Sequence, residues 1–206
     1  MKKLFSEECL PLDISEQDVL EAMKQMQGYI DITPGDFREV YQTAYALAVK
    51  RLFNTLTAAN IMTRSVVMVG EETPLVQAAA LLAEKQISGA PVINLAGKIV
   101  GVVSEKDFLK EMGFGQTPSF MQIATHCLND KSCMIGRLHN RTVADIMARP
   151  AITGTPEMRI GEISTLFAER KVNRLPIIDE NNCPVGIVTR NDLAHSLFNF
   201  GEGATS

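Results

Sequence analysis

The sequence predicts an α+β fold in which one unit of strand, helix, two strands and a second helix occurs twice. The first observation is an internal repeat: the stretch starting at Gly101 reads GVVSEKDF, and the stretch starting at Gly186 reads GIVTRNDL. The second is that both copies place apolar runs around short turns, as paired strands do. A constant offset of 85 residues relates the copies. We therefore expect one structural unit, used twice.

The offset holds without a gap along the whole of each copy. Ile61, Ala83, Pro91 and Gly101 align with Ile146, Ala168, Pro176 and Gly186. The repeated unit is about 50 residues long, in the range typical of duplicated supersecondary units.

Each element of the unit has its own signal. In the first copy Leu75, Ala78 and Leu82 recur at helical spacing, which predicts an amphipathic helix after a short strand. Two apolar strands then flank a turn, Asn94–Gly97 in the first copy and Asp179–Asn182 in the second. The final helix begins in the repeated motif, after Ser104 or Thr189.

This order of residues resembles a CBS domain, and two such units in tandem resemble a Bateman module. The resemblance rests on Ile-Met, an amphipathic helix, Pro-Val/Ile-Ile, a turn and Gly-Val/Ile-Val-Ser/Thr-x-x-Asp, and it covers residues 58–112 and 142–200. It implies β-α-β-β-α repeats paired by a pseudo-twofold axis, with clefts between them that commonly hold adenosine-containing ligands. It also implies a homodimer of two modules.

The chain divides into five parts on this basis. They are an N-terminal helical extension (1–57), the first repeat (58–112), an inserted linker (113–141), the second repeat (142–200) and a tail (201–206).

The N-terminal extension predicts two helices. The first begins near Ser15 and ends near Gly28, and the second begins with Thr33 as N-cap and Pro34 at its first position, then continues to Phe53. A helix pair cannot bury its apolar stripe alone, so we expect it to pack on its own module or on a symmetric partner. A docking surface for another protein is the alternative.

Composition places the chain among ordinary globular proteins. It has 206 residues, of which 46% are hydrophobic and 21% charged, and its formal net charge is -4. An acidic balance argues against nucleic-acid and acidic-membrane partners, which select a basic excess. No apolar run approaches the ~20 residues that span a bilayer, so we expect a cytoplasmic protein.

The inserted linker contains a group of histidines and cysteines that could in principle form a metal site. His126, Cys127, Cys133 and His139 are residue types that bind zinc. The spacing lacks the Cys-x2-Cys pair that makes such sites specific, so we expect no metal here. Free thiols are expected at all four cysteines, the remaining two being Cys9 and Cys183, with a redox role for Cys127 and Cys133 as the alternative.

The repeated motif has a purely structural interpretation. Ser104 with Asp107, and Thr189 with Asp192, have the spacing of a capping box, in which the hydroxyl residue and the acid satisfy each other's backbone N–H groups. Capping alone would explain all four side chains.

The same geometry suits a nucleotide. A helix N-terminus favours phosphate, and an acid one turn into the helix can accept hydrogen bonds from ribose hydroxyls. In CBS modules that bind nucleotides the matching hydroxyl and acid contact phosphate or ribose, so the resemblance implies Thr189, Asp192, Ser104 and Asp107 as binding residues.

The second repeat is better equipped for phosphate than the first. Arg174 and Arg190 stand where the first repeat has Gly89 and Glu105, and guanidinium groups bind phosphate oxygens in bidentate fashion. The first site is therefore expected to be empty or to take a neutral adenosine group. Solvated surface arginines are the alternative for both. The candidate binding residues are Thr189, Asp192, Arg190, Arg174, Asn173, Pro176, Thr153, Ser104 and Asp107, with apolar support for adenine near Ile152, Ile177, Val67 and Val92.

The predicted function is that of a regulatory module without catalytic activity. It would bind an adenine nucleotide of the AMP, ADP or ATP class, or S-adenosylmethionine, and pass the signal to a regulated protein as a conformational change. The alternative is a ligand-free scaffold for dimerisation or protein interaction that uses the N-terminal helices. No Ser-His-Asp arrangement, Cys-His arrangement or phosphate loop of the Gly-x4-Gly-Lys type is apparent, so no enzyme is expected.

Overall fold

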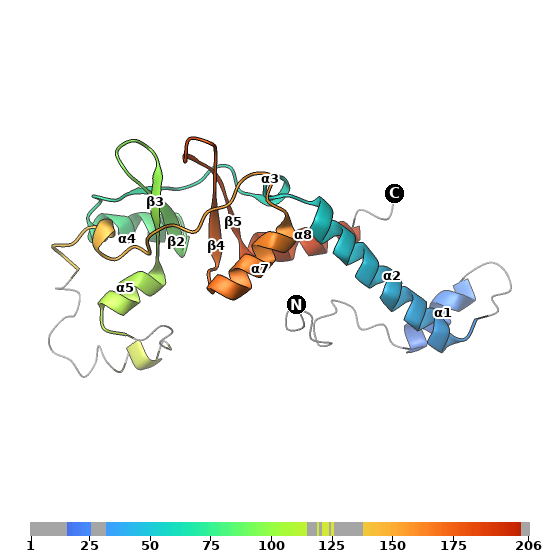
Figure 1. Cartoon of the computed structure of the whole chain (residues 1–206). Coiled ribbons are helices and arrows are strands. Elements are labelled where there is room, and N and C mark those ends of the chain that lie inside the picture. The colour runs from blue at the N-terminus through green and yellow to red at the C-terminus, as the bar shows by residue number, and fades with distance from the viewer. Residues whose placement is uncertain are drawn as a thin grey trace.

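The computed structural model describes residues 16–25, 32–114, 119, 121–123, 125 and 138–202. Figure 1 shows two strand-and-helix units side by side, with their β-hairpins facing each other at the centre and the N-terminal helices extending from one end. This is the α+β arrangement that the repeat predicts.

The first repeat contains the full predicted order of elements, whereas the first strand of the second repeat is reduced to an isolated bridge. The first comprises β1 (Val69–Gly70), α4 (Leu75–Glu84), β2 (Gly89–Ile93), β3 (Ile99–Ser104) and α5 (Glu105–Glu111). The second comprises α7 (Ile160–Arg170), β4 (Arg174–Ile178), β5 (Pro184–Thr189) and α8 (Arg190–Glu202). Strand β2 lies between β1, to which it is parallel, and β3, to which it is antiparallel. In the second repeat β4 and β5 are antiparallel, and Gly154 bridges Ile177 in parallel, in the position that β1 occupies in the first.

The hairpin turns form where the turn residues predict them. The side-chain Oδ1 of Asn94 accepts hydrogen bonds from the N–H groups two and four residues on, at 3.0 and 3.1 Å, and that of Asp179 does the same at 2.9 and 2.8 Å. Gly97 and Asn182, equivalent by the offset, both have a left-handed backbone, with φ of 73° and 65°. Glycine and asparagine are the residues that adopt this conformation most readily.

The beginning of each repeat packs on the other repeat. Thr63 and Ile187 exchange two backbone hydrogen bonds of 3.0 Å, and Val102 and Ala148 exchange two of 3.1 and 2.9 Å. Each sheet is therefore extended by a residue from the other half of the chain. This exchange ties the repeats together through backbone bonds.

Two glycines make room for the exchanged segments. A Cβ atom at Gly186 would overlap Sδ of Met62, and one at Gly101 would lie 2.9 Å from the carbonyl oxygen of Ala148. The first core contains Val143 and Met147 of the second repeat, and the second contains Ala58 of the first. The buried members of the first core are Val69, Leu75, Ala78, Leu82, Ala90, Val92, Val103, Leu138, Val143 and Met147, and those of the second are Ala58, Ile163, Phe167, Leu175, Ile177 and Val188.

The short helices that begin the repeats, α3 (Ala58–Ile61) and the 3-10 helix η3 (Val143–Asp145), are capped in the same way. Thr57 N donates to Asn60 Oδ1 at 2.9 Å, and Thr142 N donates to Asp145 Oδ2 at 2.8 Å. The pKa of Asp145 lies below its ordinary value, mainly because its carboxylate accepts the hydrogen bond from the Thr142 backbone N–H.

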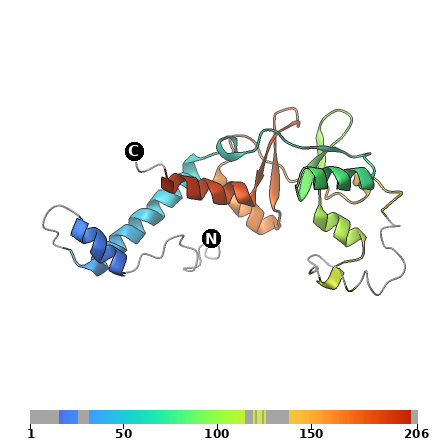
Figure 2. The ribbon, with the colours of Figure 1, turned by 180° about the vertical axis from the view of Figure 1, so that it is seen from behind.

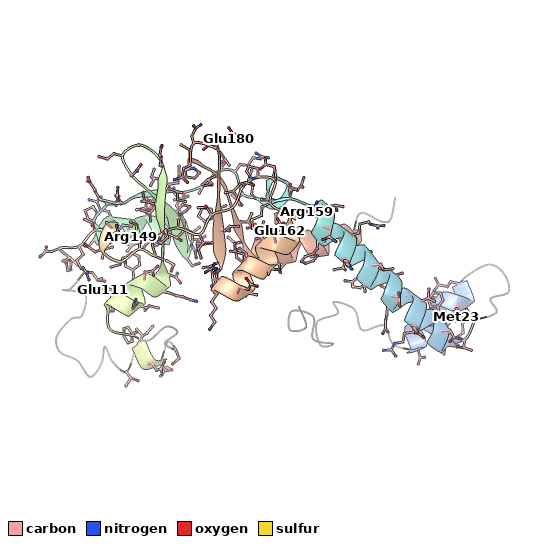
Figure 3. All side chains as sticks on the ribbon, in the orientation of Figure 1. Met23, Glu111, Arg149, Arg159, Glu162 and Glu180 are labelled. Atoms are coloured by element: carbon pink, nitrogen blue, oxygen red, sulfur yellow. The ribbon has the colours of Figure 1, made fainter. Side chains whose placement is uncertain are left out.

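A further contact of this type starts α7. The N–H of Arg159 donates to Glu162 Oε2 at 3.0 Å, and Figure 3 places the two labelled residues together at the beginning of that helix.

The N-terminal extension forms helices α1 (Glu16–Gln25) and α2 (Pro34–Thr55). Helix α2 starts as predicted, because Asp36 N donates to Thr33 Oγ1 at 3.2 Å and Thr33 Oγ1 donates to Asp36 Oδ2 at 2.6 Å. The rings of Tyr41 and Tyr45 stack with centroids 6.2 Å apart. In both views the helix runs outward from α7 and α8 (Figure 2), and α1, which carries Met23, lies at its outer end (Figure 3).

Helix α2 contacts its own module at its C-terminal end. A Cβ atom at Gly161 of α7 would lie 3.2 Å from the carbonyl oxygen of Phe53, so the two helices approach closely there. The predicted packing of the helix pair on its module is thus observed at this end of α2, while Val40 and Leu47 farther out are 60% and 62% exposed.

The metal hypothesis falls mainly on residues that the structure does not describe. His126, Cys127 and Cys133 lie outside the described residues, and so does most of the inserted linker. Of the helices that are described, none combines the length and the apolar character required to cross a lipid bilayer.

Candidate functional site

Two equivalent junctions join a strand to a helix. Ser104 ends β3 and Thr189 ends β5, and in each case the next residue begins a helix. The backbone N–H and the hydroxyl of Ser104 both donate to Asp107 Oδ2 at 2.7 Å, and those of Thr189 donate to Asp192 Oδ2 at 2.7 and 2.6 Å. The capping geometry predicted from the motif is therefore confirmed.

Asp107 and Asp192 each keep one carboxylate oxygen available for a ligand. Both hydrogen bonds at each junction use Oδ2, and among the described residues no hydrogen bond to Oδ1 of Asp107 or Asp192 is found. Both residues are half-buried and so remain accessible from one side. A carboxylate oxygen that is fixed in position and partly exposed can accept hydrogen bonds from hydroxyl groups of a ligand.

Arg174 connects the two junctions. Its backbone pairs with Thr189 across β4 and β5, as Gly89 pairs with Ser104 across β2 and β3. Its guanidinium does not stay with its own repeat: Nη2 donates to Ser88 Oγ at 2.8 Å, on the first repeat. Burial lowers the pKa of Arg174, whereas the charges of Glu105 and Asp107 raise it. The cation of the second repeat thus lies beside the first repeat's motif.

The absence of a side chain at Gly89 permits this crossing. A Cβ atom there would overlap Nη1 of Arg174 and the carbonyl oxygen of Val103, and would lie 2.7 Å from Cζ of Arg174. The φ of Gly89 is 155°, a conformation found almost only in glycine. Since Gly89 and Arg174 are equivalent by the repeat, the large residue of one copy fills the space that its counterpart leaves.

Arg190 has a different role in the fold. Its Nη2 donates to the carbonyl oxygen of Phe167 at 3.1 Å and its Nε to that of Val172 at 3.4 Å. These carbonyls lie in and just after the last turn of α7, where basic side chains satisfy unpaired carbonyl groups. Both arginines thus have hydrogen-bond partners in the fold: Arg174 is half-buried, whereas Arg190 is exposed, as the surface alternative expects.

The other candidates are placed less favourably. Asn173 contributes its carbonyl oxygen, which accepts from Arg190 N at 3.2 Å, and Thr153 is half-buried next to the Gly154 bridge. The ring of Pro176 is fully buried and its carbonyl oxygen accepts from Gly154 N. The structure therefore does not favour a ligand contact through the Pro176 side chain, because the strand directs it into the interior.

The apolar residues named for adenine are also core residues in part. Ile177 and Val92 are fully buried, one in each core. Their side chains are committed to packing, as is usual for apolar strand residues.

Sequence reasoning missed two residues that join the repeats. One is Ser88, the partner of Arg174. The other is Asn182. Its side-chain Nδ2 donates to the backbone carbonyl oxygen of Ile99 at 3.3 Å, and its backbone carbonyl oxygen accepts from Ile99 N at 3.0 Å. A signal for Asn182 existed: it stands where the first repeat has Gly97, and asparagine supplies a side chain in the same left-handed conformation.

Comparison with known families decides the wider assignment. The model of the CBS domain matches residues 58–113 and 143–199, which together make up more than half of the chain. The chain belongs to the CBS domain family. The resemblance predicted from the repeated motif is thereby confirmed, and this is a tandem CBS protein.

One relative of this CBS protein matches over most of its own length, and another matches over only part of it. MJ1426 of Methanocaldococcus jannaschii is 30% identical over 64% of this chain and 85% of its own length. Inosine-5'-monophosphate dehydrogenase of Korarchaeum cryptofilum is 29% identical over 89% of this chain, but only 32% of the dehydrogenase is covered. The similarity to that enzyme therefore does not extend over most of its length.

A solved CBS pair supplies a structural comparison. The structure of CBSX2 in complex with AMP, a protein of Arabidopsis thaliana, matches with a TM-score of 0.55 and 26% identity. The match covers 69% of this chain and 97% of CBSX2.

Proposed function

We propose that this CBS protein is a regulatory module that binds an adenine nucleotide of the AMP, ADP or ATP class between its repeats. The Thr189–Asp192 junction is the proposed principal site. Asp192 would accept hydrogen bonds from the ribose hydroxyls, and the N-terminus of α8 with Thr189 would face the phosphate. The AMP complex of the related CBSX2 supports this ligand class.

The observation that carries the proposal is the position of Arg174. Its backbone lies opposite Thr189, and its guanidinium reaches Ser88 of the other repeat. A guanidinium has five N–H donors, so a phosphate near Thr189 could engage this side chain in bidentate fashion once the guanidinium turned from Ser88 toward Thr189. Arg190 begins α8 and would bring a second positive charge to this junction if its guanidinium left the carbonyl oxygens of Phe167 and Val172.

The same contact offers a route for the signal. In the structure Arg174 holds the second repeat to Ser88 of the first. A phosphate that draws the guanidinium toward Thr189 would compete with that hydrogen bond and favour a different relation between the repeats. A ligand shifts such an equilibrium only through a difference in affinity for the two arrangements, and Arg174 would be the source of that difference.

The Ser104–Asp107 junction is proposed as a second site of weaker phosphate affinity. Glu105 follows the hydroxyl there, so a polyphosphate would meet an added negative charge. Arg174 is the cation that could compensate it, and one guanidinium cannot serve both junctions fully. We therefore expect the second site to take adenosine or a monophosphate.

Calorimetric titration and thermal unfolding test the proposal. We expect AMP, ADP or ATP to bind, and a ligand at about 100 times its Kd to stabilise the fold by about 2.7 kcal/mol. GMP serves as the control for adenine recognition, and S-adenosylmethionine and adenosine test whether phosphate is required. Failure of every adenosine compound to bind at millimolar concentration would contradict the proposal and leave the ligand-free scaffold as the better account.

A further inference from the structure

Helix α2 has an exposed apolar side that neither α1 nor the module covers. Val40 and Leu47 are 60% and 62% exposed, and Thr43 and Ala44 between them are exposed too. The four positions fall on one side of a helix with 3.6 residues per turn. The half-buried residues Phe37, Tyr45 and Ala48 lie on a different side.

A helix with apolar residues on two sides is usually covered on both. Helix α2 extends away from the CBS repeats in both views of the ribbon (Figures 1 and 2), so its own module does not reach this side. We call the side formed by Val40, Thr43, Ala44 and Leu47 the outer face of α2.

Charged side chains flank the outer face at both of its ends. Asp36 and Glu39 lie at its N-terminal end, and Lys50 and Arg51 lie at its C-terminal end; all four are exposed. None of the ion pairs between described residues uses Glu39, Lys50 or Arg51. The face is therefore acidic at one end and basic at the other.

A second copy of the same helix, running antiparallel, matches this pattern in full. With the twofold axis between Thr43 and Ala44, Val40 of each copy lies opposite Leu47 of the other. Glu39 then lies near Lys50, on the same edge of the helix pair. Such an interface is isologous, as in most homodimers.

The same register places Asp36 near Arg51 at each end. The small side chain of Ala44 at the centre lets the two backbones approach. A parallel pairing would instead set acid against acid and base against base, which disfavours it.

We propose that the outer face of α2 is a dimerisation surface, on which a second copy of this chain docks in antiparallel orientation. The contact would extend for about 22 Å, from Asp36 to Arg51 at 1.5 Å per residue. The inference goes beyond nucleotide binding and does not depend on it. It places the two CBS modules of the dimer at opposite ends of the paired α2 helices.

Charge reversal tests the proposal with the full chain. Sedimentation velocity at low ionic strength, between about 1 and 500 µM, should show a concentration-dependent dimer for the unaltered protein. Glu39→Lys and Lys50→Glu should each raise the dimer Kd about tenfold, because each variant creates two like-charge contacts. An equimolar mixture of the two variants should recover the dimer, because opposite charges then face each other again.

Orientation is read from the salt dependence. Antiparallel pairing predicts that the unaltered dimer weakens as salt screens the attraction, whereas parallel pairing predicts the reverse. Strengthening with salt would overturn the proposed orientation.

The apolar centre is tested separately. Leu47→Lys should raise the dimer Kd by about 100-fold or more, because two leucines lose their buried positions. Leu95→Lys, at the 92% exposed tip of the first hairpin, is the matched control and should leave the dimer intact. Circular dichroism and urea denaturation of each variant establish that the fold is retained. A chain that stays monomeric at 500 µM, or a dimer that none of the α2 variants weakens, would overturn the proposal.

Discussion

Gly89→Ala is expected to lower the free energy of unfolding by about 3 kcal/mol or more. The added Cβ atom would overlap the Arg174 guanidinium and the carbonyl oxygen of Val103, in a backbone conformation with φ of 155°. Alanine rarely adopts this conformation, so strain and steric overlap act together. Urea denaturation of the variant measures the loss.

Gly97→Ala is the matched control for that variant. Gly97 also has a positive φ, of 73°, but no atom lies within 4 Å of its Cβ position. Gly97→Ala should lower the free energy of unfolding by about 1 to 2 kcal/mol, from backbone strain alone. Combining Gly89→Ala with Arg174→Ala should recover part of the loss, with a coupling energy above about 1 kcal/mol. Equal losses at the two glycines and no coupling would show that Arg174 does not occupy the space over Gly89.

Asp192→Ala is expected to weaken AMP binding by about 30-fold. In the proposed site this carboxylate accepts hydrogen bonds from the ribose, and hydrogen bonds to charged groups contribute about 1.5 to 3 kcal/mol. Isothermal titration calorimetry on the purified variant gives the change directly.

Asp192 also caps α8, so a control must separate the two roles. Asp145→Ala removes an acid that caps η3 through the same pair of bonds from Thr142, at 2.8 and 3.3 Å, in a part of the chain that contains no proposed binding residue. It should leave AMP affinity unchanged within about twofold. If Asp145→Ala weakened AMP binding as much as Asp192→Ala, the effect at Asp192 would reflect capping alone.

The order of elements could be predicted because each is specified by local residues. Asn94 and Asp179 form the turns that their side chains predict, and Thr33 begins α2. The offset of 85 carried these assignments from one repeat to the other, so a signal that was weak in one copy was supported by the other.

The exchange of segments between the repeats could not be predicted in the same way. Met62 packs on Gly186 of the other repeat, but its own repeat contains the equivalent Gly101. Because the copies have the same residue types at these positions, packing within a repeat and packing across repeats satisfy the same local pattern. Only the path of the chain between the repeats distinguishes packing within a repeat from packing across repeats.

The position of Arg174 escaped prediction for a related reason. The sequence places it beside Thr189, where its backbone indeed lies, but a long side chain can reach about as far as a neighbouring sheet. Its destination depends on the space at Gly89 and on the hydroxyl of Ser88, two features of the other repeat. The position of a long side chain between two repeats can therefore be assigned only when the residues that face it on the other repeat are known.

A crystal structure of the protein with AMP tests the central claim most directly. The account predicts ribose hydroxyls within hydrogen-bonding distance of Asp192, phosphate oxygens beside Thr189 and Arg174, and a guanidinium that has left Ser88. AMP bound away from the Thr189–Asp192 junction, or bound there with Arg174 still on Ser88 and out of reach of the phosphate, would contradict it.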